Sequence, residues 1–552
     1  MSVKTPLIPP RTLKVPITNV YAMGGYCAQL RFGANKTPAN LIIDTGSSTL
    51  VVSDCDYDDK QDSCLVPTSF AQEVLYGVGG WDGPVVHTRV GIREEEIDFN
   101  LVDDYQLEPN PDAHAPIVLN DCPVAIVSSI KQEGTFLHAD GILGLAYHQL
   151  NKSYNLKGYF DKYQISPALT YPWPFDSQIS ICSNDYHAHL NANQVENQFE
   201  NKAVHSEQGC KHRFTSHDLR QFKAFLKQQP AQDIIPYFTE LTQHGLTANK
   251  FAFYSRRSSV HFTADINAAS FSAKKSADKA KKAAQQAHFA QLNQDPLNQG
   301  WLIIGGGEEH TELYQGEFTT ISVVEDKYYN VNLISIQVGD QTEIDSLLTE
   351  EIENSLELND SVEPIESTEH LASHDHALLS AIGMNKQLRG RSNAIIDTGV
   401  SGIVFTKHLY NAMVEHFSAL NPKFAALLKP FSDIAMQYQG IDMSQLNLDE
   451  WPILTLHFVG ERNHHSQHAH SSGDHSSDNN QNSPEKVSLH IKPEHYWQTN
   501  TPSEGKACFK ILSQLAGWPN QSLLGLPLMN DHYVIFDRSA HQTGVIHFAK
   551  QR

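Results

Sequence analysis

The chain has 552 residues, which is longer than one compact hydrophobic core usually supports. Charged residues make up 19% of it and hydrophobic residues 40%, a composition that favours folded domains over a disordered chain. Lysine and arginine number 41 against 63 aspartates and glutamates, and the net charge of −22 argues against a protein that binds nucleic acid through its phosphates. No apolar run approaches the roughly 18 residues of a transmembrane helix, so we expect no membrane span.

The N-terminal residues and the cysteines bear on the compartment. Prolines interrupt the first ten residues, and no apolar run resembles the core of a signal peptide. The seven cysteines are sparse and form no CxxC pair, which excludes a disulfide scaffold and a thiolate zinc finger. We expect a cytoplasmic protein with free thiols; the alternative is export to the periplasm or medium by an unrecognised route, where Cys55 and Cys64 could close a small loop.

Two segments of the chain repeat each other. Residues 41–52 read LIIDTGSSTLVV and residues 394–405 read AIIDTGVSGIVF, with seven of twelve positions identical. Each copy predicts an apolar strand, a tight loop containing Asp-Thr-Gly, and a second apolar strand. The glycine lets the backbone turn and approach a neighbour closely. One such loop alone is equally compatible with an ordinary Asx-type turn, whereas two copies with matching flanks predict paired functional aspartates, Asp44 and Asp397.

A second short element also occurs twice. Residues 140–147 contain Ile142-Leu143-Gly144, and residues 522–528 contain Leu523-Leu524-Gly525. Each copy follows an Asp-Thr-Gly loop at long range, as it would if each half of the chain closed its own β-barrel around its own loop. The sequence therefore predicts an all-β protein with two related lobes, each of which presents one aspartate.

Several stretches exceed what two such lobes require. Residues 148–250 are too long for a simple connection, and residues 256–299 include an Ala/Lys-rich run that predicts a solvated or partner-binding helix. Residues 341–385 are acidic and predict a flexible loop. Residues 461–486 form a histidine-rich loop that could bind zinc or copper, but without ordering residues nearby we expect no metal site and no cofactor.

These motifs resemble the pepsin-like aspartic endopeptidases, and most closely the prokaryotic homologues that lack a signal and a prosegment. The resemblance runs from about residue 15 to residue 548. It implies a bilobal acid-protease fold, with two β-barrel lobes, residues 15–310 and 311–552, a cleft between them, and loop or helical insertions. Further segments carry the resemblance as a flap hairpin, as strands of a sheet that joins the lobes and as C-terminal strands: 75–83, 251–254, 302–306, 533–538 and 544–546.

The resemblance assigns chemical roles residue by residue. Asp44 and Asp397 would share one proton, as is known for the pepsin dyad, and would activate a water against a peptide bond without metal or covalent intermediate. It assigns support of the dyad to Thr45, Thr398, Ser48 and Ser401, with the two threonines linking the loops. It assigns substrate contact to Tyr76 of the flap and to Gly77, Gly46, Gly399 and Ser47. We expect polypeptide substrates, inhibition by pepstatin-type compounds and a monomer.

Two departures from the family pattern matter. Val400 stands where the family often has a threonine, and the missing hydroxyl removes a donor that would stabilise a carboxylate. We therefore expect a pH optimum less acidic than that of a digestive pepsin, and not below about pH 3. Val51 stands where the family commonly has a tryptophan that bonds the flap tyrosine.

Other function classes are less consistent with the sequence. It contains neither the HExxH motif of a metal hydrolase nor the GxSxG elbow of a serine hydrolase. The alternative to an active endopeptidase is a catalytically weak or inactive pepsin-like binding protein, which Val51 and Val400 leave open. A scaffold whose insertions recruit partners is compatible with either.

Overall fold

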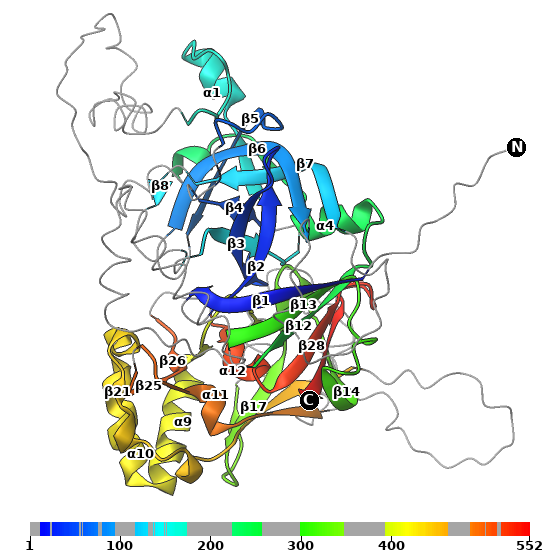
Figure 1. The fold of residues 1–552 in the computed structure, drawn as a ribbon. Coiled ribbons are helices and arrows are strands. Elements are labelled where there is room, and N and C mark those ends of the chain that lie inside the picture. Colours follow the sequence, from blue (N-terminus) through cyan, green and yellow to red (C-terminus); the bar gives the residue numbers. More distant parts are fainter. Residues whose placement is uncertain are drawn as a thin grey trace, which may run out of the picture. The chain divides into compact units, whose positions relative to one another are not determined.

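A computed structural model gives the structure of the chain. It describes residues 12–22, 25–53, 57, 59–75, 80–93, 116–127, 129–130, 136, 139–147, 150, 152–173, 224–256, 298–346, 392–461, 486–502, 504–515 and 520–552. The described chain is mostly β, as expected from the sequence (Figure 1).

The chain divides into two compact units. The larger unit comprises Met1–Cys27, Ile43–Gly46 and Gly245–Arg552, and the smaller unit comprises Ala28–Ile42 and Ser47–His244. These bounds differ from the lobes 15–310 and 311–552, chiefly because residues 245–310 cluster with the larger unit. The four residues Ile43–Gly46, which include Asp44, also belong to the larger unit.

A closed six-stranded barrel forms most of the smaller unit (Figure 1). It closes because β6 pairs with β2 as well as with β7. Its strands, in order around the barrel, are β2 (Gly25–Phe32), β3 (Thr37–Asp44), β9 (Gly141–Gly144), β4 (Leu50–Val52), β7 (Ile117–Ile126) and β6 (Gly80–Ile92). Inward and outward residues alternate where one face meets solvent: Leu30 and Phe32 are buried, whereas Gln29 is exposed.

The first long insertion extends this unit from strand β5 (Val66–Leu75), which pairs with β6. Its described elements are β10 (Lys152–Asn155), α1 (Lys157–Lys162), β11 (Ala231–Asp233) and α4 (Tyr237–Gln243). The short strand β8 (Ser129–Ile130), which precedes the insertion, pairs with β6. Strand β10 pairs with β5, and a separate apolar cluster packs there around Leu156, Phe160 and Trp173. The described parts of residues 148–244 therefore belong to the barrel unit.

The largest sheet of the larger unit contains the N-terminal strand. Its strands, in order, are β1 (Leu13–Ala22), β13 (Gln299–Ile304), β12 (Lys250–Ser255), β28 (His532–Asp537), β29 (Val545–Gln551) and β14 (Tyr314–Ser322). Strands β1 and β12 both pair antiparallel with β13. Segments 251–254 and 302–306, singled out in the sequence, thus contribute neighbouring strands.

Three smaller sheets complete the β structure of this unit. The first contains, in order, β15 (Glu325–Asp326), β16 (Tyr329–Val331), β19 (Ala394–Ile396), β27 (Ser522–Leu524), β20 (Ile403–Phe405) and β26 (Ile511–Ser513). The second contains β18 (Ile344–Asp345), β17 (Leu333–Val338), β22 (Leu454–Val459) and β23 (Lys486–Ile491). The third contains β21 (Ile441–Asp442), β25 (Lys506–Phe509) and β24 (Trp497–Thr499).

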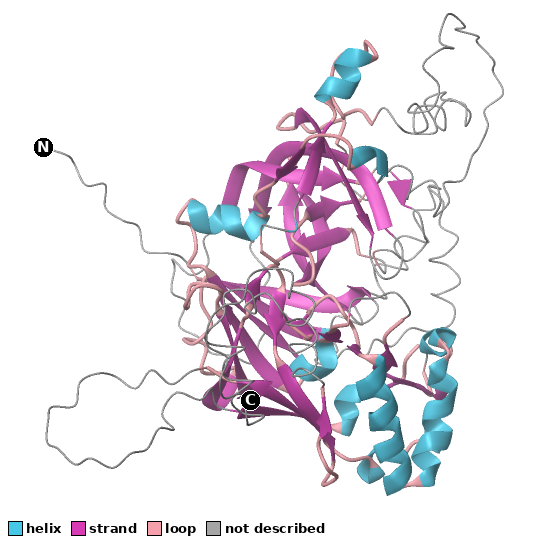
Figure 2. Ribbon diagram, turned by 180° about the vertical axis from the view of Figure 1, so that it is seen from behind, coloured by secondary structure: helices cyan, strands magenta, loops and turns pink. Residues whose placement is uncertain are grey.

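The larger unit also contains helices, drawn in cyan in Figure 2, and an aromatic cluster to which several of them contribute. The helices are α9 (Lys407–Leu420), α10 (Pro422–Leu428), η6 (Lys429–Ser432), η7 (Ile434–Tyr438), η8 (Met443–Gln445), η9 (Leu448–Glu450), α11 (Pro493–Tyr496) and α12 (Leu526–Met529). Trp451 is central to the cluster: its ring stacks on Phe424 with centroids 4.1 Å apart and meets Phe417 and Trp497 edge-on.

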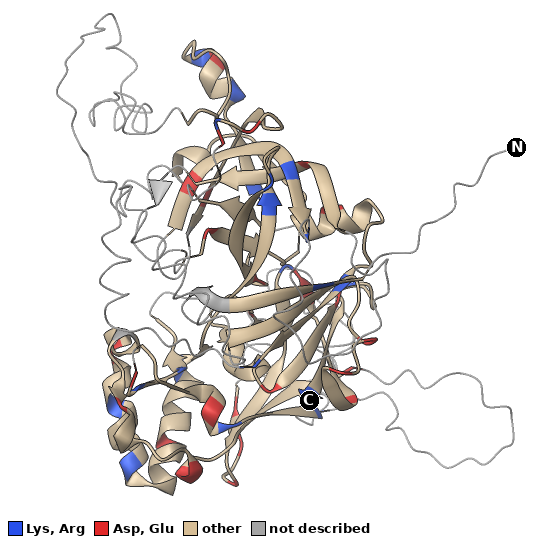
Figure 3. Cartoon of the chain, in the orientation of Figure 1, with Lys and Arg blue, Asp and Glu red and all other residues tan. Residues whose placement is uncertain are grey.

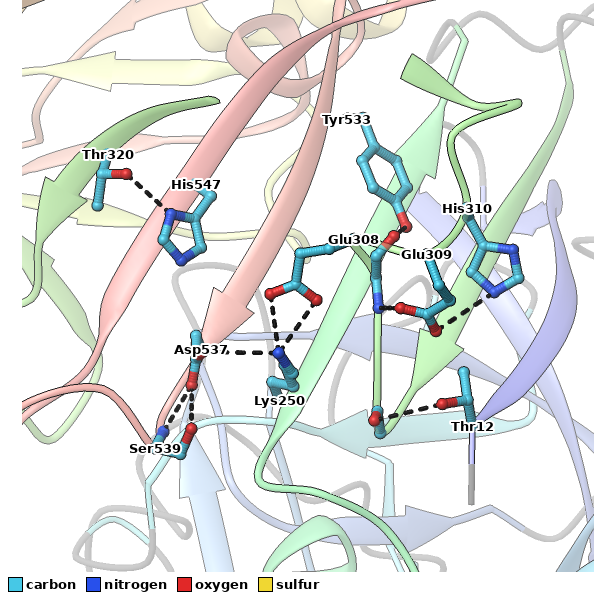
Figure 4. A network of polar contacts seen from close by, with 12 residues as sticks. Thr12, Lys250, Glu308, Glu309, His310, Thr320, Tyr533, Asp537, Ser539 and His547 are labelled. Atoms are coloured by element: carbon cyan, nitrogen blue, oxygen red, sulfur yellow. Dashed lines mark hydrogen bonds and ion pairs between the residues drawn. The ribbon is translucent and has the colours of Figure 1, made fainter. Parts of the chain in front are cut away.

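A polar network ties the loop after β13 to the neighbouring strands (Figure 4). Lys250 contacts both carboxylate oxygens of Glu308 at 2.8 and 3.0 Å and lies 3.9 Å from Asp537. The hydroxyl of Tyr533 donates to the carbonyl of Gly307 at 2.8 Å. Glu309 accepts from the Gly307 N–H at 2.8 Å, so the loop is held by side chains from β12 and β28 and by its own carboxylate.

Several sequence expectations lie outside the described residues. These are the Ala/Lys-rich helix within 256–299, nearly all of the acidic loop 341–385 and of the histidine-rich loop 461–486, and Cys55. Among the residues that the structure describes, Cys27, Cys64, Cys122 and Cys508 form no disulfide. Among the described helices, none is long and apolar enough to cross a membrane. Figure 3 shows acidic and basic residues interspersed on both units.

Candidate active site

Asp44 and Asp397 both belong to the larger unit, and each lies where a strand with buried last residues gives way to a loop. Asp44 is the last residue of β3, and Asp397 follows directly on β19. Both are 8% exposed. Each carboxylate accepts a hydrogen bond from the backbone N–H of its own loop glycine, Gly46 or Gly399, at 2.8 Å. The two Asp-Thr-Gly copies therefore have the same local geometry.

Thr45 and Thr398 bind the two loops to each other. The Thr45 N–H donates to Oγ1 of Thr398 at 3.1 Å, and the Thr398 N–H donates to Oγ1 of Thr45 at 2.9 Å. Each hydroxyl then donates to the carbonyl that precedes the opposite aspartate, Ile396 for Thr45 at 3.0 Å and Ile43 for Thr398 at 2.8 Å. Both threonines are fully buried, so four hydrogen bonds hold the aspartates in fixed register.

The loop glycines are required by the carboxylates that face them. A Cβ on Gly46 would collide with the carboxylate of Asp397, and a Cβ on Gly399 would lie 2.6 Å from Oδ1 of Asp44. Each glycine thus packs against the aspartate of the other loop. Any larger residue at these positions would push the two carboxyl groups apart.

The electrostatics of the site depend on its burial. Burial first, and then the negative charge of Asp44, raise the pKa of Asp397 well above its ordinary value. A hydrogen bond between the two carboxyl groups acts in the same direction, while the N–H groups of Gly399 and Gly46 oppose it. Such a pair holds one proton between two carboxyl groups over a range of pH in which separate aspartates would both be ionised.

This arrangement can perform general acid–base chemistry. The ionised member of a proton-sharing pair can take a proton from a water, and the protonated member can donate one to an oxygen of the reacting group. The rigid support matters because a catalytic constellation loses rate steeply when its groups are displaced by about 1 Å. Nothing in the pair distinguishes the acid from the base, since the titration belongs to both residues.

Tyr328 is a residue near the site that sequence reasoning missed. Strand β16 pairs antiparallel with β19 in the register Asn330 to Ile395, and continuing that register by two residues places Tyr328 opposite Asp397. Burial raises the pKa of the Tyr328 hydroxyl, and the charges of Asp397 and Asp44 raise it further. The pairing joins segments separated by the 341–385 insertion, so no local sequence signal identifies this neighbour.

The second repeated element pairs in the same way in each half of the chain. In the smaller unit β4 runs antiparallel to β9, with Val51 opposite Ile142, and the Gly144 N–H donates to the backbone carbonyl of Thr49 at 3.1 Å. In the larger unit β20 runs antiparallel to β27, with Val404 opposite Leu523, and the Gly525 N–H donates to the backbone carbonyl of Gly402 at 3.1 Å. The internal repeat of the sequence is therefore also a repeat of strand pairing.

The structure describes the three serines that the sequence analysis assigns to the site, but not the two residues that it assigns to the flap. Ser48 is buried, whereas Ser47 and Ser401 are half-buried. Tyr76 and Gly77 lie outside the described residues.

Two apolar residues of the barrel strands β4 and β6 are fully buried. Val51, in the position where the family commonly has a tryptophan, and Trp81, in strand β6, are both 0% exposed. In the described part of the chain no group of three or more His, Cys, Asp and Glu side chains is placed to hold a metal ion.

Comparison with protein-family models and with curated protein sequences finds no match.

Proposed function

We propose that this protein is an aspartic endopeptidase, which hydrolyses peptide bonds in polypeptides through a water activated by Asp44 and Asp397. The observation that carries the proposal is the pair of Asp-Thr-Gly loops bound reciprocally through Thr45 and Thr398. An isolated turn aspartate has no need of such a partner. The raised pKa of Asp397 supports the same assignment, because a proton-sharing pair supplies an acid and a base together.

The proposed mechanism needs no group beyond the pair and water. One carboxylate removes a proton from the water as it attacks the scissile carbonyl carbon, and the protonated carboxyl group donates to the carbonyl oxygen. The tetrahedral intermediate then collapses as the amine leaves with a proton. In the attack one proton passes from the water to the dyad and another from the dyad to the carbonyl oxygen. In the collapse the dyad gives a proton to the amine nitrogen as the C–N bond breaks and takes one back from a hydroxyl of the intermediate, so the pair returns to its starting state.

The pepsin-like bilobal fold is part of the same proposal. It is supported by the sequence repeat around Asp44 and Asp397, by the closed barrel and by the matched pairing of β4 with β9 and of β20 with β27. The flap role of Tyr76 and Gly77 rests on the sequence resemblance. So do the substrate contacts of Ser47, Gly46 and Gly399.

The alternative is a catalytically weak or inactive binding protein on the same frame. Val400 favours it to the extent that an aliphatic side chain, adjacent to Gly399, replaces a hydroxyl donor. The four loop residues that hold the dyad are nevertheless present: Thr45, Thr398, Gly46 and Gly399. A protein without catalysis would have no need of the same geometry in both loops.

The test is cleavage of an unfolded protein by the purified full-length chain from pH 3 to 7, with and without pepstatin. Asp44→Asn and Asp397→Asn are compared with Asp442→Asn, which removes an exposed carboxylate elsewhere in the larger unit. Pepstatin-sensitive cleavage that both dyad variants lose and Asp442→Asn retains is the expected result. Cleavage that survives in either dyad variant, or a folded protein without cleavage, would overturn the proposal. An optimum below about pH 3 would contradict the argument from Val400.

A further inference from the structure

A hydroxyl, an imidazole and a carboxylate lie side by side, in that spatial order, on one face of the four-stranded sheet of the larger unit. His457 on β22 is opposite Ser488 on β23, and the Ser488 Oγ lies 2.7 Å from Nδ1 of the imidazole. The other ring nitrogen, Nε2, lies 3.7 Å from Oε1 of Glu343, in the loop before β18. None of these residues belongs to the Asp-Thr-Gly loops.

The burial of the three groups differs in a way that suits a reactive hydroxyl. His457 is 7% exposed, whereas Ser488 is exposed and Glu343 is 41% exposed in its side chain. Nε2 of His457 has no hydrogen-bond partner among the residues that the structure describes. The imidazole therefore lies between the neighbouring strands of the sheet, opposite Ser335 on one side and Ser488 on the other, while Ser488 itself is an exposed residue.

The charged neighbours define the protonation states. Lys486 contacts both oxygens of Glu343 at 2.6 Å, and the Ser335 hydroxyl donates to the same carboxylate at 2.5 Å. Although burial opposes it, these contacts lower the pKa of Glu343, so it is a carboxylate at neutral pH. Its charge favours the proton of His457 on Nε2, which leaves Nδ1 as the acceptor for the Ser488 hydroxyl.

The same surroundings keep the imidazole neutral. Burial first, and then the positive charge of Lys486, lower the pKa of His457, while Glu343 opposes this and His490 adds slightly to it. A neutral imidazole bonded to a hydroxyl is a general base, and a base oriented by a third group is the arrangement that activates serine nucleophiles. Glu343 needs to move by less than about 1 Å to bond Nε2 directly.

We propose that Ser488 is an acyl-acceptor site in which His457 is the general base and Glu343 orients it, and that the site takes small activated acyl esters. In the step, Ser488 Oγ bonds to the acyl carbon and its proton passes to His457 Nδ1. The bond between the acyl carbon and the leaving oxygen breaks, and the leaving alkoxide or phenolate takes the proton from the imidazole. The products are O-acylated Ser488 and the free alcohol or phenol.

The experiment measures acylation of the folded full-length chain by p-nitrophenyl acetate, with p-nitrophenol release followed by absorbance and the modified residue identified by peptide mass spectrometry. All variants carry Asp397→Asn, which removes the proposed peptidase, so failure of this proposal and failure of the proposed function are distinguishable. Ser488→Ala and His457→Gln are compared with Ser444→Ala. Ser444 is an exposed serine whose hydroxyl donates to Asp442 at 2.7 Å without an imidazole.

We expect acylation at Ser488, its complete loss in Ser488→Ala, and a rate lowered about 100-fold in His457→Gln. Ser444→Ala should react like the parent. The rate at Ser488 should fall only below about pH 6.5, since the reaction needs the neutral imidazole and its pKa is lowered. Equal labelling of Ser488 in His457→Gln, labelling of Ser444 at the same rate, or no label on Ser488 would each overturn the proposal.

Discussion

Thr45 and Thr398 are 353 residues apart in the chain, and each donates its backbone N–H to the hydroxyl oxygen of the other. A reciprocal pair of this kind couples two loops more strictly than one bond, because moving either loop breaks both. The two hydroxyl groups also satisfy buried carbonyl groups of Ile43 and Ile396. Removing one hydroxyl therefore leaves several buried polar groups without partners.

Replacement of Thr398 tests this coupling directly. Thr398→Ala deprives the Thr45 N–H and the Ile43 carbonyl of partners, and we expect the free energy of unfolding to fall by about 2–4 kcal/mol. Thr398→Ser keeps the hydroxyl and loses one methyl group, at about 1 kcal/mol. Urea unfolding of both variants measures the difference. Equal losses in the two variants would show that the hydroxyl contributes nothing.

The loop glycines have no room for a side chain, and this can be tested by substitution. In Gly46→Ala the new methyl group collides with the carboxylate of Asp397, so we expect loss of stability and, under the proposed function, loss of peptide cleavage. Gly158→Ala is the matched control: Gly158 lies in helix α1 with no atom in the way of a Cβ, and alanine should stabilise that helix by about 0.5–1 kcal/mol. Thermal unfolding and the cleavage assay compare them. An active, stable Gly46→Ala protein would contradict the close packing.

The raised pKa of Asp397 makes a prediction about stability and pH. A group whose pKa is higher in the folded state favours folding below its unfolded pKa of about 3.9, and this contribution is lost as pH rises through the folded pKa. Asparagine cannot ionise, so Asp397→Asn should become more stable than the parent as pH rises from 4 to 7. The gain is about 1.4 kcal/mol for each unit of the shift. Urea unfolding at both pH values measures it, and a difference between variant and parent that is the same at pH 4 and 7 would refute the shift.

The sequence predicted the loops well because their signals are local. Asp-Thr-Gly between two apolar strands defines a turn, and the repeat of that pattern indicates two equivalent turns. The strands around Leu143 and Leu524 were also identified from short apolar runs that end in glycine. Mostly β structure follows from many such runs.

The neighbours of the dyad could not be predicted in this way. Tyr328 lies opposite Asp397 only because of the register of β16 with β19. These two strands lie on either side of the long 341–385 insertion in the chain, so their pairing cannot be read from a local segment. The contact of Ser488 with His457 depends in the same way on the register of β22 with β23, on either side of the 461–486 insertion. Side-chain pairs across strands need tertiary register, and the composition of one segment does not contain it.

Asp62 should stabilise the smaller unit in a pH-dependent way. Its carboxylate accepts hydrogen bonds from the N–H groups of Ala34 and Cys64 and from the hydroxyl groups of Tyr57 and Thr88. Burial opposes ionisation, but these donors together lower the pKa of Asp62. A lowered carboxyl pKa contributes stability above the unfolded value of about 3.9, and the contribution is lost as pH falls through the folded pKa.

Asp62→Asn keeps one acceptor oxygen and removes the charge, so we expect it to lower the free energy of unfolding by about 2–3 kcal/mol at pH 7. The loss should shrink when the same urea unfolding is repeated near pH 3. Asp121→Asn, at an exposed carboxylate of the same unit, serves as the control and should change stability by less than about 1 kcal/mol. A loss in Asp62→Asn that is the same at both pH values would exclude the charge as its cause.

Lys510 is a buried cation whose removal should stabilise the protein. It is 8% exposed, and among the described residues its ammonium group has no ion pair or side-chain hydrogen bond. Burial lowers the pKa of Lys510, so the unfolded chain binds the proton more tightly than the folded one and folding is penalised below the unfolded pKa of about 10.4. Lys510→Met has a similar volume and no charge to bury, and we expect it to raise the free energy of unfolding by about 1–3 kcal/mol at pH 6. The gain should shrink near pH 9.5, where the parent loses the proton more easily.

Lys423→Met, at an exposed position of helix α10, should change stability by less than about 0.5 kcal/mol at both pH values. A destabilised Lys510→Met protein would show that the ammonium group has a stabilising partner after all.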